Sequence, residues 1–238
     1  MKTIGNHWAV LIGISFVMGC GKPVPQADGS KALTISDPSP SDMNTDCLGI
    51  HQNGIKLSIP GNHKLTVCAC AYRDGKYDPM LSKGYEMPAP GNAAYTAVVT
   101  SGFFYPGTLT GEPTTRTKVF GAVSTRLTQE GLTKSNSLVF LNHWVDLGDD
   151  GRQASFHHGT HSPAIGRRAF WYGIACGAGE TRVDEGGIQS PKPLVVNSYY
   201  LVEEMTPAEL EGKSAGRDLD MSVPPKGLPL ELKSKLDD

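Results

Sequence analysis

Histidines crowd one short stretch of this 238-residue chain. His157, His158 and His161 lie within five positions in "FHHGTHSPAIGRR", and His143 lies upstream. An imidazole acts as a general base, binds metal ions and changes its charge near neutral pH. The stretch therefore raises three hypotheses: nucleophilic catalysis with the thiol of Cys176, metal binding, or a structural role in a binding module.

The enzyme hypothesis rests on residues 158–177, "HGTHSPAIGRRAFWYGIACG". This segment resembles the active-site segment of the L,D-transpeptidases, which cross-link peptidoglycan. In that family His-Gly-Thr is followed by a loop with Ile-Gly and basic residues, and then by a cysteine. The resemblance implies Cys176 as the nucleophile, His158 or His161 as its base, and Arg167 or Arg168 as the charge that lowers the pKa of the thiol. The Ser-His-Gly-Cys-Ile-Arg core of the family is absent, so a degenerate relative fits the same residues.

The metal hypothesis rests on imidazole and carboxylate groups, which suit zinc or copper. His157 and His158 are adjacent on a predicted strand, so they point to opposite faces and only one of them can join a given site. The sequence predicts no resident metal or other cofactor. The acidic residues nearest to the histidines are Asp146, Asp149, Asp150, Glu180, Asp184 and Glu185.

In the third hypothesis the histidines are structural residues of a binding module and take part in no reaction. Phe170 and Trp171 follow Arg167 and Arg168, and such aromatic residues most often pack in a core. If they faced outward beside the arginines, they would bind a glycan, a peptide or another envelope protein. We favour a binding or structural module, with peptidoglycan or another envelope protein as its partner, and leave open whether the chain is an enzyme.

The N-terminus has the order of an export signal. Lys2 precedes an apolar run over residues 8–17, which is too short to cross a membrane as a helix. Residues 17–20, Val-Met-Gly-Cys, resemble the lipobox of bacterial lipoproteins. The resemblance implies cleavage before Cys20, a diacylglycerol on its thiol, and an acyl chain such as palmitate on its amine. It also implies a lipid anchor in the cell envelope, with Gly21 favouring the outer membrane, facing the periplasm or the cell surface.

The charge of the chain argues against nucleic acid as a partner. The formal net charge is −2, with 22 basic and 24 acidic residues and no basic stripe. After the N-terminus no apolar run approaches the roughly 18 residues that a spanning helix needs. The membrane contact that we predict is therefore made through the lipid.

Four further cysteines would meet an oxidising compartment in an exported chain. Cys68 and Cys70 lie two apart on one predicted strand, about 6.6 Å along it, which disfavours a bond between them. We predict two disulfides, which join one of these residues to Cys47 and the other to Cys176. A bonded Cys176 has no nucleophilic thiol, so the disulfide and enzyme hypotheses exclude each other.

Alternating apolar and polar residues predict strands along most of the chain. Pro60, Gly61 and Asn62 predict a hairpin between the first two strands, and residues 72–92 predict a long loop. The expected fold class is mostly β: a single antiparallel or mixed β domain, sandwich or barrel-like, with few short helices. The predicted strands are 54–59, 64–72, 95–105, 117–127, 137–147, 153–160, 169–177 and 193–204.

Composition divides the chain into four parts. Residues 1–19 are the expected signal peptide, and residues 20–46, which lack aromatic side chains, are an expected disordered tether. Residues 47–203 form the predicted β-rich domain. In 204–238, Thr206 and Glu209 predict the capping box of a short helix, followed by a disordered tail or an arm that docks on the domain.

Overall fold

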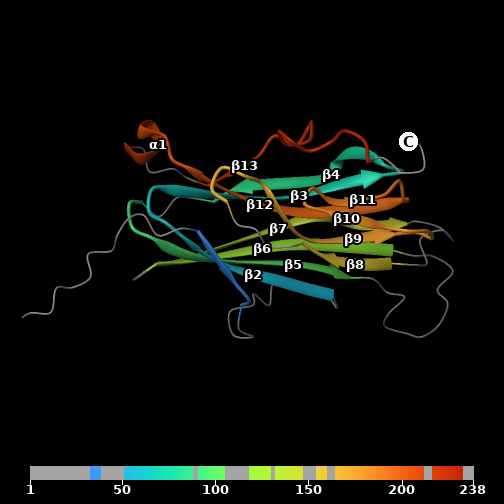
Figure 1. Ribbon diagram of the computed structural model, residues 1–238, viewed down its shortest axis with the longest axis horizontal. Coiled ribbons are helices and arrows are strands. Elements are labelled where there is room, and N and C mark those ends of the chain that lie inside the picture. The colour runs from blue at the N-terminus through green and yellow to red at the C-terminus, as the bar shows by residue number, and fades with distance from the viewer. Residues whose placement is uncertain are drawn as a thin grey trace, which may run out of the picture.

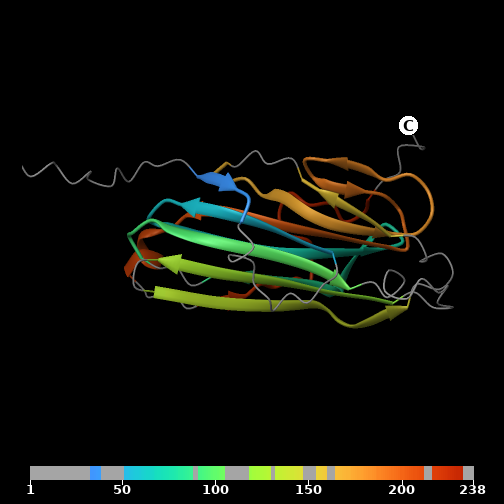
Figure 2. The ribbon, with the colours of Figure 1, turned by 90° about the horizontal axis from the view of Figure 1, so that it is seen from below.

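The structure is a computed structural model, and it is built almost wholly from antiparallel strands. This confirms the predicted mostly β class, in its sandwich form, because two sheets pack face to face around one core (Figure 1, Figure 2). No helix in the described part of the chain is long and apolar enough to cross a membrane. The structure describes residues 33–38, 51–87, 91–104, 118–129, 132–146, 154–159, 164–211 and 216–232.

The first sheet has five strands in the order β1-β2-β5-β6-β7, and neighbouring strands are antiparallel. Valine, threonine and phenylalanine recur along these strands and suit a pleated, half-buried surface. The strands are β1 (Thr34–Ser36), β2 (His51–Ile59), β5 (Tyr95–Phe104), β6 (Lys118–Gln129) and β7 (Leu132–Asp146).

The second sheet has six strands in the order β13-β4-β3-β12-β9-β8, again antiparallel throughout. A separate two-stranded hairpin, β10–β11, lies against it. The strands are β3 (His63–Arg73), β4 (Lys76–Glu86), β8 (Ala154–His158), β9 (Ala169–Cys176), β10 (Arg182–Asp184), β11 (Gly187–Gln189), β12 (Leu194–Glu204) and β13 (Arg217–Asp218).

Strand β3 shows how the six-stranded sheet is buried on both faces. Its side chains alternate, so that Val67 and Ala69 join the core between the sheets while Cys68 and Cys70 join a second cluster on the outer face. The neighbouring strand β12 is buried from Leu194 to Leu201 without a break. The outer face of this sheet therefore needs a cover of its own.

Part of that cover is residues 216–232, here called the C-terminal arm, which runs along the outside of β4 and β3 (Figure 1). The Leu219 amide donates a hydrogen bond to the Gly84 carbonyl, and the Leu232 amide donates one to Gly75. Met221 is buried in the outer cluster together with Leu232. Of the two expectations for the tail, disorder or an arm that docks on the domain, this segment shows the docked arm, because its scattered apolar residues fill the outer face.

The short helix was predicted correctly. It is α1 (Pro207–Glu211), and its capping box is complete. The Thr206 backbone amide donates to the Glu209 carboxylate at 2.8 Å, and the Glu209 amide donates to the Thr206 hydroxyl at 3.3 Å. The Glu209 carboxylate also accepts a hydrogen bond from Lys64 at 2.6 Å, which ties the helix to β3.

Two local predictions were wrong. The turn at residues 60–62 does not close a hairpin, because β2 pairs in the five-stranded sheet and β3 in the six-stranded sheet. Residues 72–92 do not form a long loop, because β3 and β4 pair as a hairpin around Asp74 and Gly75. Both of these turn residues have positive φ, 50° and 77°, as the tight Asp-Gly hairpin turn requires.

The predicted tether also contains structure. Its residues 34–36 form β1, which pairs with β2, and Leu33 is buried beside them. One short apolar-polar alternation was thus enough to add a strand at the sheet edge. The expected signal peptide, Cys20 and the rest of the tether lie outside the described residues.

Candidate functional site

The two adjacent histidines lie on β8, the edge strand of the six-stranded sheet, and point to opposite faces as predicted. His158 is exposed, its ring lies 5.2 Å from that of Tyr172, and its Nδ1 accepts a hydrogen bond from the Asn53 amide at 2.9 Å. His157 is half-buried on the outer face, with its Nε2 2.9 Å from Ser155 Oγ.

Cys176 does not meet these histidines as the enzyme hypothesis requires. It is the last residue of β9, faces the core and is 0% exposed. It pairs with Ala154, four residues before His158, which puts the two roughly 13 Å apart along the strand. Burial raises the pKa of the Cys176 thiol to about 12. The thiol is therefore neutral and shielded, which is the reverse of an activated nucleophile.

The other proposed catalytic residues are not brought to Cys176 either. Arg167 is exposed and forms an ion pair with Glu185. His161 lies outside the described residues. Among the described residues, then, no base and no charged group of the predicted catalytic set is assembled around the thiol.

The predicted disulfide between Cys176 and the Cys68–Cys70 pair was wrong. Cys68, Cys70 and Cys176 are all free, because Cys176 faces the core between the sheets while the other two face the opposite side. Cys47 lies outside the described residues. A hydrogen bond from Cys70 lowers the pKa of Cys68, with help from Arg168, and the same bond raises the pKa of Cys70.

The described residues contain no group of three histidine, cysteine or acidic side chains arranged for a metal ion. The side chains of His143 and His161 are outside the described part of the chain, so the predicted four-histidine set is not seen together. His157 and His158 have separate partners on separate faces.

A pocket does lie beside His157, on the outer face of the sheet. Its volume is about 320 Å³, within the range of small-ligand sites. Ala154, Ser155 and His157 come from β8, Lys192 comes from the segment before β12, and the rest comes from the segment after β9. Its lining residues are Ala154, Ser155, His157, Gly177, Gly179, Thr181 and Lys192.

Lys192 is the unusual member of this pocket. The residue is only 8% exposed, and it forms no ion pair or hydrogen bond with any residue that the structure describes. Burial lowers its pKa. Its ammonium nitrogen is not among the described polar atoms that are sealed from solvent without a partner, so it reaches the pocket that it lines. The pocket thus presents a positive charge that no ion pair or hydrogen bond among the described residues neutralises.

The neighbouring polar side chains bond each other. The Ser155 hydroxyl donates to the Ala175 carbonyl at 3.4 Å, which leaves its oxygen to accept from His157 Nε2. Gly177 and Gly179 have positive φ, so the chain turns tightly at the pocket with no side chain there. The Lys192 ammonium beside this open glycine turn is therefore the group whose chemistry fits an anion.

Sequence reasoning identified His157 but missed Lys192. The available signal was its position between Pro191 and Pro193, directly before an apolar run that becomes a central strand. The proline that follows restricts the backbone of this lysine to extended conformations, which continue into the buried strand. Comparisons of the chain with family models, curated proteins and solved structures find no match.

The pocket predicts a pH dependence of stability. Burial, and next the charge of Lys192, hold the pKa of His157 below its usual 6.5. The unfolded chain therefore takes up the proton first, and the stability present above pH 6.5 falls as the pH drops toward the lower folded pKa. We expect His157→Gln to lose less unfolding free energy than the native chain between pH 7 and pH 5, measured by urea denaturation. Equal losses in the two proteins would contradict this assignment.

Proposed function

We propose that the chain is a lipid-anchored protein of the bacterial cell envelope, whose β-sandwich binds a small anion or an anionic group at the Lys192 pocket. The anchor part of this proposal is supported by the lipobox-like residues 17–20 and the preceding apolar run. The binding part is supported by the pocket itself.

The observation that carries the binding proposal is the uncompensated charge of Lys192. A bound carboxylate or phosphate would supply the missing negative charge in a partly desolvated site, where such pairing is stronger than in water. The net charge of the chain is −2, so general attraction of anions by the whole protein does not explain the site. The pocket volume admits one such group with part of its carrier.

The anchor limits where this site can act. Twelve residues separate Cys20 from Leu33, the residue before β1. The thirteen steps from Cys20 to Leu33 span at most about 45 Å when fully extended. A ligand of this protein is therefore met close to the membrane surface, as part of the envelope or in solution beside it.

The transpeptidase alternative finds no geometric support in the described residues. It needs an accessible thiol within reach of a histidine, whereas Cys176 is enclosed in the core and paired far from His158. We therefore do not assign a peptidoglycan acyl transfer to this stretch. Peptidoglycan stays a possible partner in the proposal as a polymer that carries carboxylates.

The anion site is tested by replacing its charge while keeping its volume. Inorganic phosphate and succinate are titrated separately against the native chain, and the free energy of unfolding is followed. We expect at least one of them to stabilise the native chain by about 2–3 kcal/mol at 100 times its dissociation constant. Lys192→Met should not respond, and without added anion it should be at least as stable as the native chain.

The matched control is Lys226→Met, which removes an exposed lysine from the C-terminal arm. It should respond to the anion as the native chain does. If phosphate and succinate stabilise neither protein, or stabilise Lys192→Met equally, the pocket is not an anion site.

The anchor is tested by expressing the chain in a bacterial host and reading the mass of its N-terminal peptide. We expect a peptide that begins at Cys20 and carries acyl chains, and a native chain that stays in the membrane fraction. Cys20→Ser should leave the lipid off and release the chain from that fraction. An unmodified Cys20 in the native chain would refute the anchor.

A further inference from the structure

Cys68 and Cys70 form a buried pair that the anion site does not use. They lie on the outer face of β3, both 0% exposed, in the cluster that the C-terminal arm covers. Their side chains point the same way because they are two residues apart on one strand. Both side chains belong to the same buried cluster.

The positively charged side chain of Arg168 contacts one member of this pair. The Nη1 atom of Arg168 donates a hydrogen bond to the Cys68 sulfur at 3.3 Å, and the Nε atom of Arg168 is buried without a hydrogen-bond partner. Arg168 is half-buried, and the charge of its guanidinium beside the sulfur favours the thiolate form of Cys68 over the thiol.

A third sulfur atom completes the cluster. Gly84 of β4 pairs with Cys68, and a β-carbon at position 84 would lie 2.9 Å from the Met221 sulfur and 3.1 Å from the Cys68 β-carbon. Glycine at this position thus leaves room for the Met221 thioether to lie over the strand beside Cys68. Met221 belongs to the same buried cluster as both cysteines.

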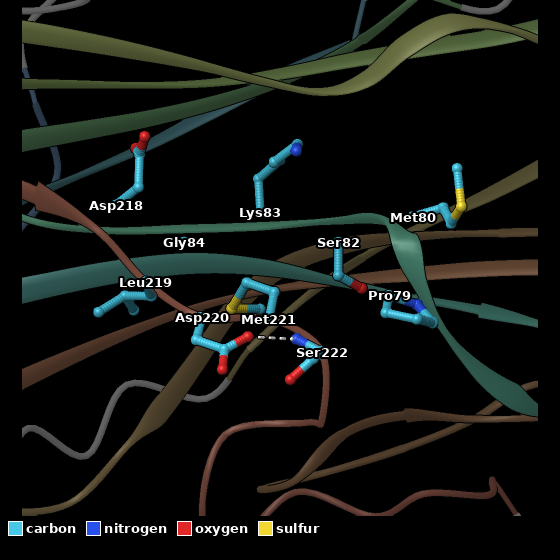
Figure 3. A pocket seen from close by; sticks show the side chains of 10 residues that line it. All are labelled: Pro79, Met80, Ser82, Lys83, Gly84, Asp218, Leu219, Asp220, Met221 and Ser222. Atoms are coloured by element: carbon cyan, nitrogen blue, oxygen red, sulfur yellow. Dashed lines mark hydrogen bonds between the residues drawn. The ribbon is translucent and has the colours of Figure 1, made fainter.

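A surface pocket opens next to these sulfurs. It has a volume of about 590 Å³ and is lined by Gly84 and Met221, among other residues of β4 and the arm. Figure 3 shows Met221 beside Leu219 and Ser82, with Met80 pointing away from them. Met80 is 77% exposed. Two thioethers, one exposed and one buried, therefore line this pocket, and the buried one belongs to the same cluster as the cysteine pair.

From this arrangement we propose that Cys68, Cys70 and Met221 form a binding site for a soft monovalent metal ion, of which Cu(I) is the natural case. Thiolate and thioether ligands prefer such soft ions over magnesium, calcium or manganese. Binding replaces the thiol protons, which leave to solvent, and forms two thiolate–metal bonds with the thioether as a third ligand. No electron is transferred in this step.

The charges of the two thiolates and of Arg168 favour a monovalent ion over a divalent one. Two thiolates carry two negative charges, which Cu(I) and the Arg168 guanidinium together neutralise. A divalent ion would leave a buried net positive charge, which is costly in this setting. Zinc also requires four ligands in structural sites, and the described residues offer no third histidine, cysteine or carboxylate at this pair.

The test is an anaerobic titration of the full chain, reduced beforehand, with Cu(I) in competition with bicinchoninate, and in parallel with Ag(I) as a redox-inert probe. We expect one ion per chain. Cys68→Ala and Cys70→Ala should each weaken the affinity more than about 100-fold, beyond what loss of a supporting residue costs. Met221→Leu should weaken it about 10-fold.

Two control variants each remove one sulfur atom that is not a proposed ligand. Met80→Leu removes an exposed thioether on the pocket, and Cys176→Ala removes a buried thiol on the opposite face of the sheet. Both should bind Cu(I) as the native chain does. Circular dichroism of each variant checks that the sandwich is folded.

A further test uses only the native chain: X-ray absorption at the copper edge of the Cu(I)-loaded protein identifies the atoms bound to the ion. We expect sulfur ligands only, two at short and one at longer distance. Nitrogen ligands would place the ion on histidines and overturn the proposal. So would unchanged affinity in Cys68→Ala and Cys70→Ala, or a native chain isolated with a Cys68–Cys70 disulfide that reducing agents do not open.

Discussion

The burial of the six-stranded sheet on both faces is the constraint on which the rest of the structure depends. Strand β12 pairs with β3 on one side and β9 on the other, and it is buried from Leu194 to Leu201. If the other sheet covered only one of its two apolar faces, the second face would expose a patch of aromatic and aliphatic side chains. The β10–β11 hairpin and the C-terminal arm supply the second layer of contacts that this sheet requires.

The hairpin is held by polar groups that reach through the sheet surface. The Asn197 side chain of β12 bonds both the amide and the carbonyl of Ile188, at 3.0 and 3.2 Å. The Tyr199 hydroxyl donates to the Gly186 carbonyl at 2.7 Å. These bonds satisfy buried backbone groups that would otherwise be costly, so the hairpin is fixed over the sheet rather than loosely attached.

Both candidate sites lie on this outer face, one at each side of β12. At one side Lys192 and His157 line the anion pocket, and at the other Arg168 faces Cys68 beneath the arm. In each case a basic side chain is drawn into the boundary between sheet and cover without an acidic partner. Cys176, by contrast, packs in the hydrophobic core between the sheets.

Local sequence patterns predicted most of the strands, because side-chain alternation records which residues are half-buried. They did not predict which strands pair. Pro60, Gly61 and Asn62 signal a turn equally well whether the next strand returns to the same sheet or crosses to the other. The alternation in β3 was read correctly, but cysteines on an outer face look exposed until the arm is known to cover them.

The site was harder to predict than the strands, because it depends on which strands pair. Lys192, Ser155 and the glycine turn come from separate segments, and only the pairing of β8 with β9 brings them together. His157 was found because histidines are conspicuous in sequence. Its function could not be read from its neighbours along the chain, since His158 next to it points to the other face.

Reactivity of the three described cysteines tests the covering of the outer face most directly. The full chain and a chain that ends at Glu211 are treated with iodoacetamide under native conditions, and labelling is read by mass spectrometry. The account predicts three slow thiols in the full chain. In the folded shortened chain Cys68 and Cys70 should react quickly while Cys176 stays protected. If Cys68 and Cys70 stay as slow as Cys176 when the arm is gone, the arm does not cover them and the account is contradicted.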